Sequence, residues 1–190
     1  MRDFLHALVL DEHPSYLWFL TTYGTTTGQT GHFANKIMQK KGLSFAAYFS
    51  VKMPDTWTPI FDLSDLQKVR RINLNAEREI DFAIKKIQSR SAGDYMRNKV
   101  PTILAKTFYG LEYDAMRKTS HFKVENPCIG CGLCAKNCPV SAIEIRNKKP
   151  VWVKDRCVMC LSCLHHCPKF AIQYENRTKK HGQYTNPNVK

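Results

Sequence analysis

The spacing of apolar and polar positions predicts an α/β fold in the first half of the chain. Residues 16–22 are apolar at nearly every position, which is typical of a strand covered on both faces of a sheet. Apolar residues then recur at helical spacing over 33–41, and Gly42 follows as a helix C-cap. Residues 43–53 are rich in aromatic and β-branched side chains, so they form a second predicted strand. A strand, a helix and a strand in this order predict parallel pairing.

A long helix is predicted after these strands. Ser64 and Gln67 have the spacing of a capping box, and one helical face beyond them is apolar. The residues on this face are Leu66, Val69, Ile72, Ala76, Ile80, Ala83, Ile84 and Ile87. Such a helix is expected to cover one side of the sheet.

The N-terminus and the hydropathy of the chain bear on its location. Residues 4–10 are predicted to be the end of an amphipathic helix rather than a signal peptide, because His6 interrupts the apolar run and acidic residues flank it. No run approaches the roughly 18 apolar residues that a membrane-spanning helix requires. The sequence therefore predicts a cytoplasmic protein without a membrane span.

The cysteines form two similar clusters in the last third of the chain. All eight lie between positions 128 and 167, and this clustering favours metal ligation in a reducing compartment over a disulfide scaffold. Residues 128–145 read CIGCGLCAKNCPVSAIEI, and residues 157–174 read CVMCLSCLHHCPKFAIQY. A shift of 29 residues superimposes four cysteines, a proline and an Ala-Ile pair. The pattern predicts an internal duplication of C-x2-C-x2-C-x3-C-P.

This motif is typical of a domain that holds two 4Fe-4S clusters. Three thiolates with two residues between neighbours can wrap one cluster, whereas the following proline turns the fourth cysteine toward the other cluster. The ligands predicted for the first cluster are Cys128, Cys131, Cys134 and Cys167. Those predicted for the second are Cys138, Cys157, Cys160 and Cys163. Zinc is the alternative, but a zinc ribbon has no use for the third cysteine or the repeated Cys-Pro pair.

The residues beside the ligands are expected to shield the clusters. Residues 143–145 and 151–153 alternate as a strand pair around a polar turn, and Trp152, Phe170 and Tyr174 are interpreted as apolar shielding.

The two ligand loops differ in bulk. Gly130 and Gly132 in the first loop correspond to Met159 and Leu161 in the second, so the reduction potentials of the two clusters are predicted to differ.

The net charge of +13 is concentrated at the C-terminal end. The last 70 residues carry 12 Lys and Arg against 4 Asp and Glu, whereas the first 120 carry 17 against 12. Four-thiolate clusters are anionic, so these basic residues are expected to offset the cofactors and to steer an acidic redox partner. A nucleic-acid partner is the alternative, but no nucleic-acid-binding motif is present. His165 and His166 are expected on a solvated helix face.

The cysteine segment resembles the bacterial two-cluster ferredoxins over residues 121–176. Together with YLWFLTTYG, FSVKMPD and GQYTNPNV, it makes nearly the whole chain similar to a family of bacterial flavodoxin-like/ferredoxin fusion proteins. The resemblance implies an α/β plus α+β fold, in which a partial flavodoxin-like parallel sheet with helices precedes a duplicated two-cluster ferredoxin domain. It aligns residues 16–22 with the fourth flavodoxin strand, and Tyr23, Thr25 and Thr26 with a loop that contacts FMN.

The same resemblance leaves the flavodoxin-like part incomplete. The first three strands and the phosphate loop of the family have no counterpart, as in a chain that begins at an internal start codon. FMN binding then requires a further segment or a partner that supplies this loop, because the loop provides most of the affinity. The strand at 16–22 is left as a sheet edge open to self-association.

The predicted organisation has four parts: a partial flavodoxin-like domain at 1–90, a helical connector at 91–120, a two-cluster ferredoxin domain at 121–176 and a basic tail at 177–190. Only packing on the preceding domain would order this tail. The leading functional hypothesis is an electron carrier that passes single electrons between redox partners and has no catalytic residue. The alternatives are an FMN- and iron-sulfur-dependent oxidoreductase, or a subunit of one, and a zinc- or nucleic-acid-binding adaptor.

Overall fold

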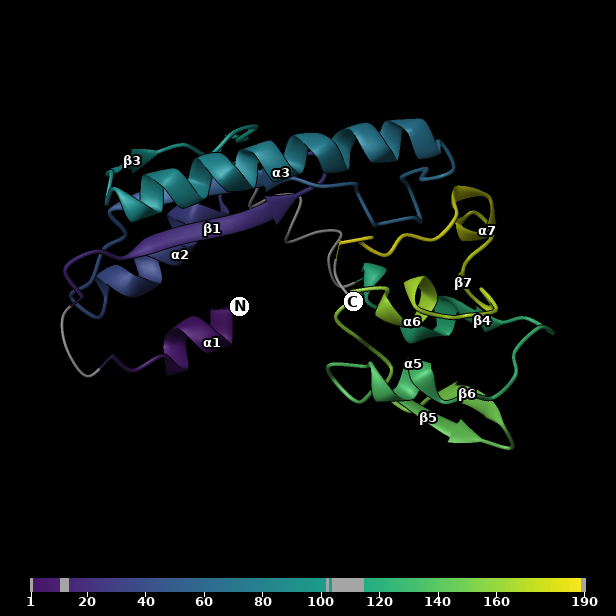
Figure 1. Cartoon of the computed structure of the whole chain (residues 1–190). Coiled ribbons are helices and arrows are strands. Elements are labelled where there is room, and N and C mark those ends of the chain that lie inside the picture. The colour runs from purple at the N-terminus through teal and green to yellow at the C-terminus, as the bar shows by residue number, and fades with distance from the viewer. Residues whose placement is uncertain (1, 11–13, 102, 104–114, 189–190) are drawn as a thin grey trace. The chain divides into compact units, whose positions relative to one another are not determined.

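The computed structural model describes residues 2–10, 14–101, 103 and 115–188. The chain divides into two compact units: unit 1 comprises Met1–Pro54 and Lys68–Thr107, and unit 2 comprises Asp55–Gln67 and Phe108–Lys190. Figure 1 shows their helices and strands. The chain therefore leaves unit 1 for 13 residues, Asp55–Gln67, before it returns. Residues 104–114 of the predicted connector lie outside the described residues.

Unit 1 is built on a parallel sheet of three strands in the order β1-β2-β3. β1 (Trp18–Tyr23) pairs with β2 (Ala47–Lys52), and β2 pairs with β3 (Gly93–Asp94). The crossover from β1 to β2 is α2 (Thr30–Gln39), which ends where Gly42 takes a φ of +73° and the Leu43 N–H donates to the Met38 carbonyl at 3.0 Å. The predicted strand-helix-strand unit and its parallel pairing are confirmed.

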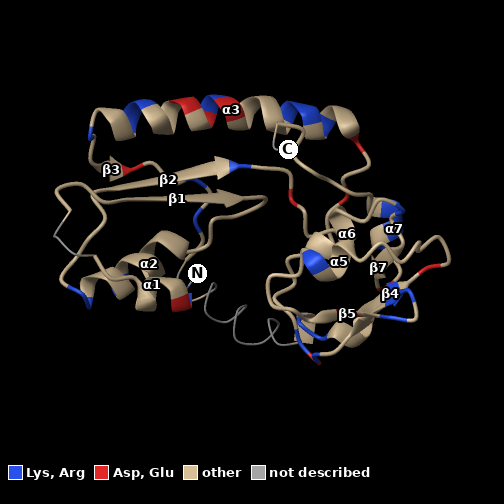
Figure 2. Cartoon of the chain, turned by 60° about the horizontal axis from the view of Figure 1, so that its bottom comes forward, with Lys and Arg blue, Asp and Glu red and all other residues tan. Residues whose placement is uncertain are grey.

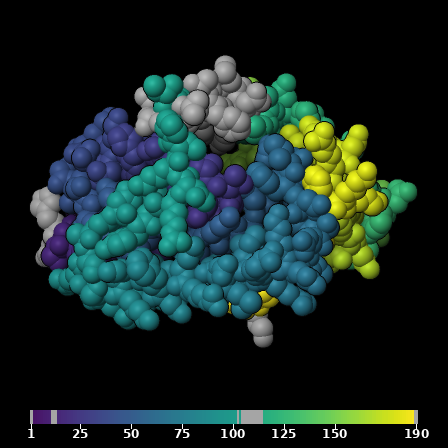
Figure 3. Space-filling model, turned by 90° about the horizontal axis from the view of Figure 1, so that it is seen from above, coloured from purple at the N-terminus to yellow at the C-terminus, as the bar shows by residue number. Residues whose placement is uncertain are grey.

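Helices cover both faces of this sheet (Figure 2). α1 (Arg2–Ala7) and α2 pack on one face around Phe19 and Met38. α3 (Leu66–Gln88) covers the other face, where Phe49 packs with Ala83. Viewed from above, α3 and the segment that follows it form a blue-to-teal layer over this face (Figure 3).

The prediction that the whole apolar face of α3 lies against the sheet is wrong at two positions. Leu66 and Ile84 are 63% and 46% exposed, whereas Ala76 and Ala83 are buried. Ile84 directly follows the buried Ala83, which turns it about 100° around the helix to the border of the apolar face.

Unit 2 contains two antiparallel strand pairs and several short helices. β4 (Phe122–Val124), preceded by the 3-10 turn η1 (Thr119–His121), pairs with β7 (Ile172–Tyr174). β5 (Ile143–Arg146) pairs with β6 (Lys149–Trp152), which confirms the predicted strand pair. The short helices are α5 (Leu133–Lys136), α6 (Ser162–His165) and α7 (Thr178–His181).

Backbone geometry in unit 2 recurs at the 29-residue spacing of the cysteine motifs. α5 and α6 begin 29 residues apart, at Leu133 and Ser162. Three pairs of residues with positive φ also have this spacing: Gly130 (68°) and Met159 (50°), Gly132 (77°) and Leu161 (54°), and Ser141 (48°) and Phe170 (47°). The second ligand loop therefore adopts the left-handed turns of the first without its glycines.

The core of unit 2 includes parts of the chain that are distant in sequence. Its buried residues are Phe122, Leu161, Leu164, Ile172 and Tyr174, and Trp57 packs against them. Phe122 stacks on Trp152 with ring centroids 4.8 Å apart. In the tail, Thr178 is fully buried and its hydroxyl donates to the Gln173 Oε1 at 2.7 Å. Packing within unit 2 thus holds the first part of the tail in place.

Candidate metal centre

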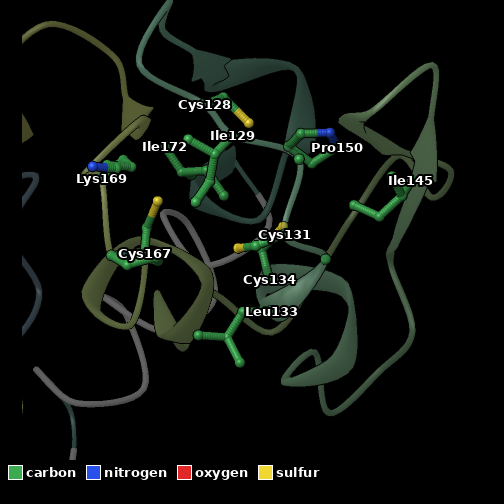
Figure 4. Close-up of a pocket in the computed structure, with 13 residues that line it drawn as sticks. Cys128, Ile129, Cys131, Leu133, Cys134, Ile145, Pro150, Cys167, Lys169 and Ile172 are labelled. Carbon is green, nitrogen blue, oxygen red and sulfur yellow. The ribbon is translucent and has the colours of Figure 1, made fainter.

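Four cysteines line one hollow in unit 2 (Figure 4). Cys128 and Cys131 lie in the loop after β4, Cys134 lies on α5, and Cys167 follows α6. Their sulfur atoms face a common space, from which the Lys169 ammonium points away. The unfilled space amounts to about 360 Å³, part of it open to solvent. Its apolar walls are Ile129, Leu133, Ile145, Pro150 and Ile172.

The other four cysteines line a second hollow. Cys138 follows α5, Cys157 and Cys160 precede α6, and Cys163 lies on it. The unfilled space is about 320 Å³, nearly that of the first hollow. Its apolar walls include Phe122, Val140, Ile143, Trp152, Val158 and Leu161. The structure thus brings together the two predicted sets of cysteines, and each set takes its fourth member from the other motif.

Backbone groups support the sulfur atoms in both hollows. The Ala142 N–H donates to the Cys138 sulfur at 3.2 Å, and the Ala171 N–H donates to the Cys167 sulfur at 3.3 Å. The Met159 N–H donates to the Cys157 sulfur at 3.4 Å. Such donors stabilise a thiolate, which is the form that binds metal.

A close approach of two loops shapes the first hollow. Gly130 has a φ of +68°, and a Cβ added to it would lie 2.4 Å from the Lys148 carbonyl oxygen. Lys148 and Asn147 form the turn between β5 and β6, both with positive φ. Only glycine allows the ligand loop to rest on this turn.

The cysteines differ in their contact with solvent. Cys131 and Cys160 are exposed, and the other six are half-buried. Burial raises the pKa of the Cys134 and Cys157 thiols, and it raises the pKa of the Cys163 thiol most strongly. Each hollow therefore has one ligand at the surface, and the second hollow has the ligand that is least stable as a free thiolate.

The donor set of each hollow fits an iron-sulfur cluster. Within the ranges that the structure describes, no three His, Cys, Asp or Glu side chains converge on a point that fits one metal ion. A structural zinc site needs four ligands at about 2.3 Å from one point. Four cysteine sulfurs in an apolar hollow are the ligands that a cubane of iron and sulfide takes.

One of the two adjacent histidines is buried, so the expected solvated position is wrong for it. His165 is 6% exposed, and its Nε2 lies 2.8 Å from the Thr56 carbonyl oxygen. Burial also lowers the pKa of His165. No local pattern signals this position, because Thr56 precedes His165 by 109 residues. His166 is exposed as expected.

The loop aligned with an FMN site in unit 1 uses its polar groups internally. The Tyr23 ring is 7% exposed, and its hydroxyl accepts a hydrogen bond from the Asn98 amide at 3.4 Å. The Thr26 hydroxyl donates to the Asn98 carbonyl at 2.6 Å, whereas Thr25 is exposed. Tyr23 therefore presents no open ring face for stacking. A separate polar hollow in unit 1 is lined by other residues, among them Gly28, Gln29, His32, Asn35, Tyr48, Asp94 and Lys99.

Residues 127–171 match the family model of the 4Fe-4S dicluster domain. The match includes all eight cysteines and supports iron-sulfur binding and electron transfer by unit 2. No curated protein matches the chain. Within the described ranges, no helix is both long and apolar enough to cross a bilayer.

Proposed function

We propose that this protein is an electron carrier that holds two 4Fe-4S clusters in unit 2. The observation that carries the proposal is the gathering of four thiols in each of two hollows of nearly equal size. Cys128, Cys131, Cys134 and Cys167 would hold one cluster, and Cys138, Cys157, Cys160 and Cys163 the other. Bound clusters supply one-electron redox chemistry at potentials set by their surroundings. The chain binds them, orients N–H groups toward the sulfurs and excludes water with apolar walls.

The recurrence of left-handed turns and short helices at 29 residues supports an origin by internal duplication. Each proposed cluster would then be held by three cysteines of one motif and the fourth cysteine of the other motif. The half-buried thiols must stay reduced to act as ligands, so the cytoplasm is the proposed location.

An acidic redox partner is proposed to dock beside the first hollow. Lys169 lines this hollow, Lys148 lies against Gly130, and Lys149 precedes the lining residue Pro150. Among the described residues these three lysines have no ion pair or side-chain hydrogen bond, and Ile129 is 59% exposed next to the exposed Cys131. Beside the second hollow, by contrast, the Lys154 ammonium donates to the Val140 carbonyl. Free lysines around an exposed apolar residue favour an acidic partner at the first hollow, because they attract carboxylates without losing internal contacts.

We also propose that β1 is a site of self-association. It lies at the edge of the sheet, and within the described ranges it pairs only with β2, with Trp18 43% exposed. An unpaired edge with an exposed aromatic residue is a template for another strand. Sedimentation velocity should show a dimer that Trp18→Lys dissociates, and a monomeric wild-type protein would refute this proposal.

Metal analysis of an anaerobic preparation tests the main proposal. We expect about eight irons and about eight acid-labile sulfides per chain, without stoichiometric flavin or zinc. Cys131→Ser and Cys160→Ser should each disturb the EPR signal of a different cluster. Zinc without sulfide would refute the electron carrier, and stoichiometric FMN would favour the oxidoreductase.

Electron-transfer rates test the docking site. An acidic redox protein should receive electrons at a rate that falls with salt, and Lys148→Glu with Lys169→Glu should lower that rate. Two matched charge reversals in unit 1, Lys36→Glu and Lys40→Glu, are the control. Equal rates in the two double variants would place the docking site elsewhere.

A further inference from the structure

Two segments that are distant in sequence meet at α6 in unit 2. Cys163 lies on this helix and lines the second hollow, whereas Cys167 follows the helix and lines the first. A displacement of α6 therefore moves one predicted ligand of each cluster. We define the clamp as residues 56–63, which lie between β2 and α3, together with residues 178–184 of the tail.

His165 connects α6 to both parts of the clamp. The backbone N–H of Tyr184 lies 3.2 Å from its Nδ1, and this N–H can only donate, so Nδ1 is the acceptor. The proton of the neutral ring is then on Nε2, which donates to the Thr56 carbonyl at 2.8 Å. A single buried side chain thus satisfies one backbone group from each segment.

Gln183 and His181 complete the clamp. The Gln183 amide donates to the Leu164 carbonyl at 2.6 Å and to the Cys167 carbonyl at 2.9 Å, both at the end of α6. The Leu63 N–H donates to the His181 carbonyl at 2.8 Å, which joins the two segments to each other. The clamp therefore holds the end of α6 and the segment after it that carries Cys167.

The clamp also adds apolar cover to the core that α6 enters. Trp57 packs against this core, in which Leu164 lies on α6 and Leu161 lines the second hollow, and Cys163 and Cys134 both adjoin it. α6 has two buried residues, Leu164 and His165, whereas α5, which occupies the corresponding place in the first motif, has none. The two short helices thus differ in what covers them, although their local geometry is the same.

We propose that the clamp positions α6 and keeps water from the second cluster, and thereby lowers the reduction potential of that cluster. This inference rests on the proposed function of unit 2. Reduction adds negative charge to an anionic cluster, and exclusion of water removes the solvation that would stabilise this charge. His165 is thus a positioning residue that acts through the helix and touches no cluster.

The test compares matched pairs of variants in the cluster-loaded protein. His165→Phe keeps a ring but removes both hydrogen bonds, and His166→Phe makes the same change at an exposed neighbour. Trp57→Ala removes the apolar cover, and Ile60→Ala is its control, since Ile60 is 58% exposed on the same segment. The readouts are the two midpoint potentials from an EPR-monitored titration and amide hydrogen exchange at residues 163–167.

His165→Phe and Trp57→Ala should raise one midpoint potential and speed exchange at α6, whereas the two controls should change neither. His165→Gln retains a donor for Thr56 and should recover part of the loss. Loss of iron in His165→Phe but not in His166→Phe also supports a positioning role for His165. In that case the midpoint potential is measured on His165→Gln instead. Unchanged potentials and exchange in all four variants would overturn the inference. Wild-type protein without iron and sulfide would instead refute the proposed function.

Discussion

Substitution of Gly130 tests the close contact between the first ligand loop and the β5–β6 turn. Gly130 has a φ of +68°, and a Cβ there would lie 2.4 Å from the Lys148 carbonyl oxygen and 3.0 Å from the Lys148 Cβ. The obstacle is backbone, so no side-chain rotation relieves it. Gly132 is a matched control on the same loop, because its φ is +77° and its added Cβ would meet only Ile145, at 3.9 Å.

The two substitutions separate two costs. A left-handed conformation costs an alanine about 1–2 kcal/mol, and both variants incur this cost. The contact with the Lys148 carbonyl adds about 1–3 kcal/mol, typical of overpacking, in Gly130→Ala alone. We therefore expect Gly130→Ala to destabilise the protein by about 2–5 kcal/mol and Gly132→Ala by about 1–2 kcal/mol.

The assay is the anaerobic decay of cluster absorbance in a fixed concentration of urea. Cluster loss makes unfolding irreversible, so the half-life is the appropriate measure of stability. The wild-type protein should persist longest and Gly130→Ala shortest. The ratio between the two variants reaches about 5- to 150-fold if the contact is already lost in the transition state for unfolding. Equal half-lives of the two variants would show that the loop moves off the turn without cost, which would refute the reasoning.

Three further predictions concern stability and are measured by urea or thermal unfolding. The Thr58 hydroxyl is buried without a hydrogen-bond partner in the described structure, so Thr58→Val should stabilise the protein by about 1 kcal/mol. The Thr178 hydroxyl is bonded to Gln173 and Tyr174, so Thr178→Val should destabilise it by about 1–3 kcal/mol. A loss of stability in both variants would contradict this reasoning. Arg90 follows α3 with a φ of 48°, so Arg90→Gly should raise the free energy of unfolding by about 0.5–1 kcal/mol. A lower free energy of unfolding would show that the contacts of the Arg90 side chain outweigh the backbone strain. Leu164 is fully buried, so Leu164→Ala should cost about 2–5 kcal/mol, and a cost below 1 kcal/mol would argue against its place in the core.

Features that depend on local spacing could be predicted from the sequence. Two residues between successive cysteines allow a short loop and one helical turn to turn three thiols toward one side, so the grouping of the cysteines around two hollows could be expected from their positions. The strand-helix-strand unit followed from the change in apolar period and from Gly42, since these patterns are set within a few residues. Ile84 was misassigned because the width of an apolar face depends on the surface that meets it.

Features that depend on distant partners could not be predicted. His165 and His166 are adjacent and chemically identical, yet one is buried by backbone groups at positions 56 and 184. Backbone carbonyls and N–H groups occur at nearly every residue, so they leave no signal in the sequence. The left-handed conformations of Met159 and Leu161 could not be predicted either, because only glycine indicates such a turn in a sequence.

The sequence by itself determined the chemistry of this protein: the number and spacing of the thiols, the basic charge around them and the parallel strand order of unit 1. Only the tertiary structure decided how the two hollows differ, since Trp57 and the tail pack beside α6 while α5 has no buried residue. The physical reason is that ligand identity belongs to each residue, whereas burial depends on what the rest of the chain places next to it.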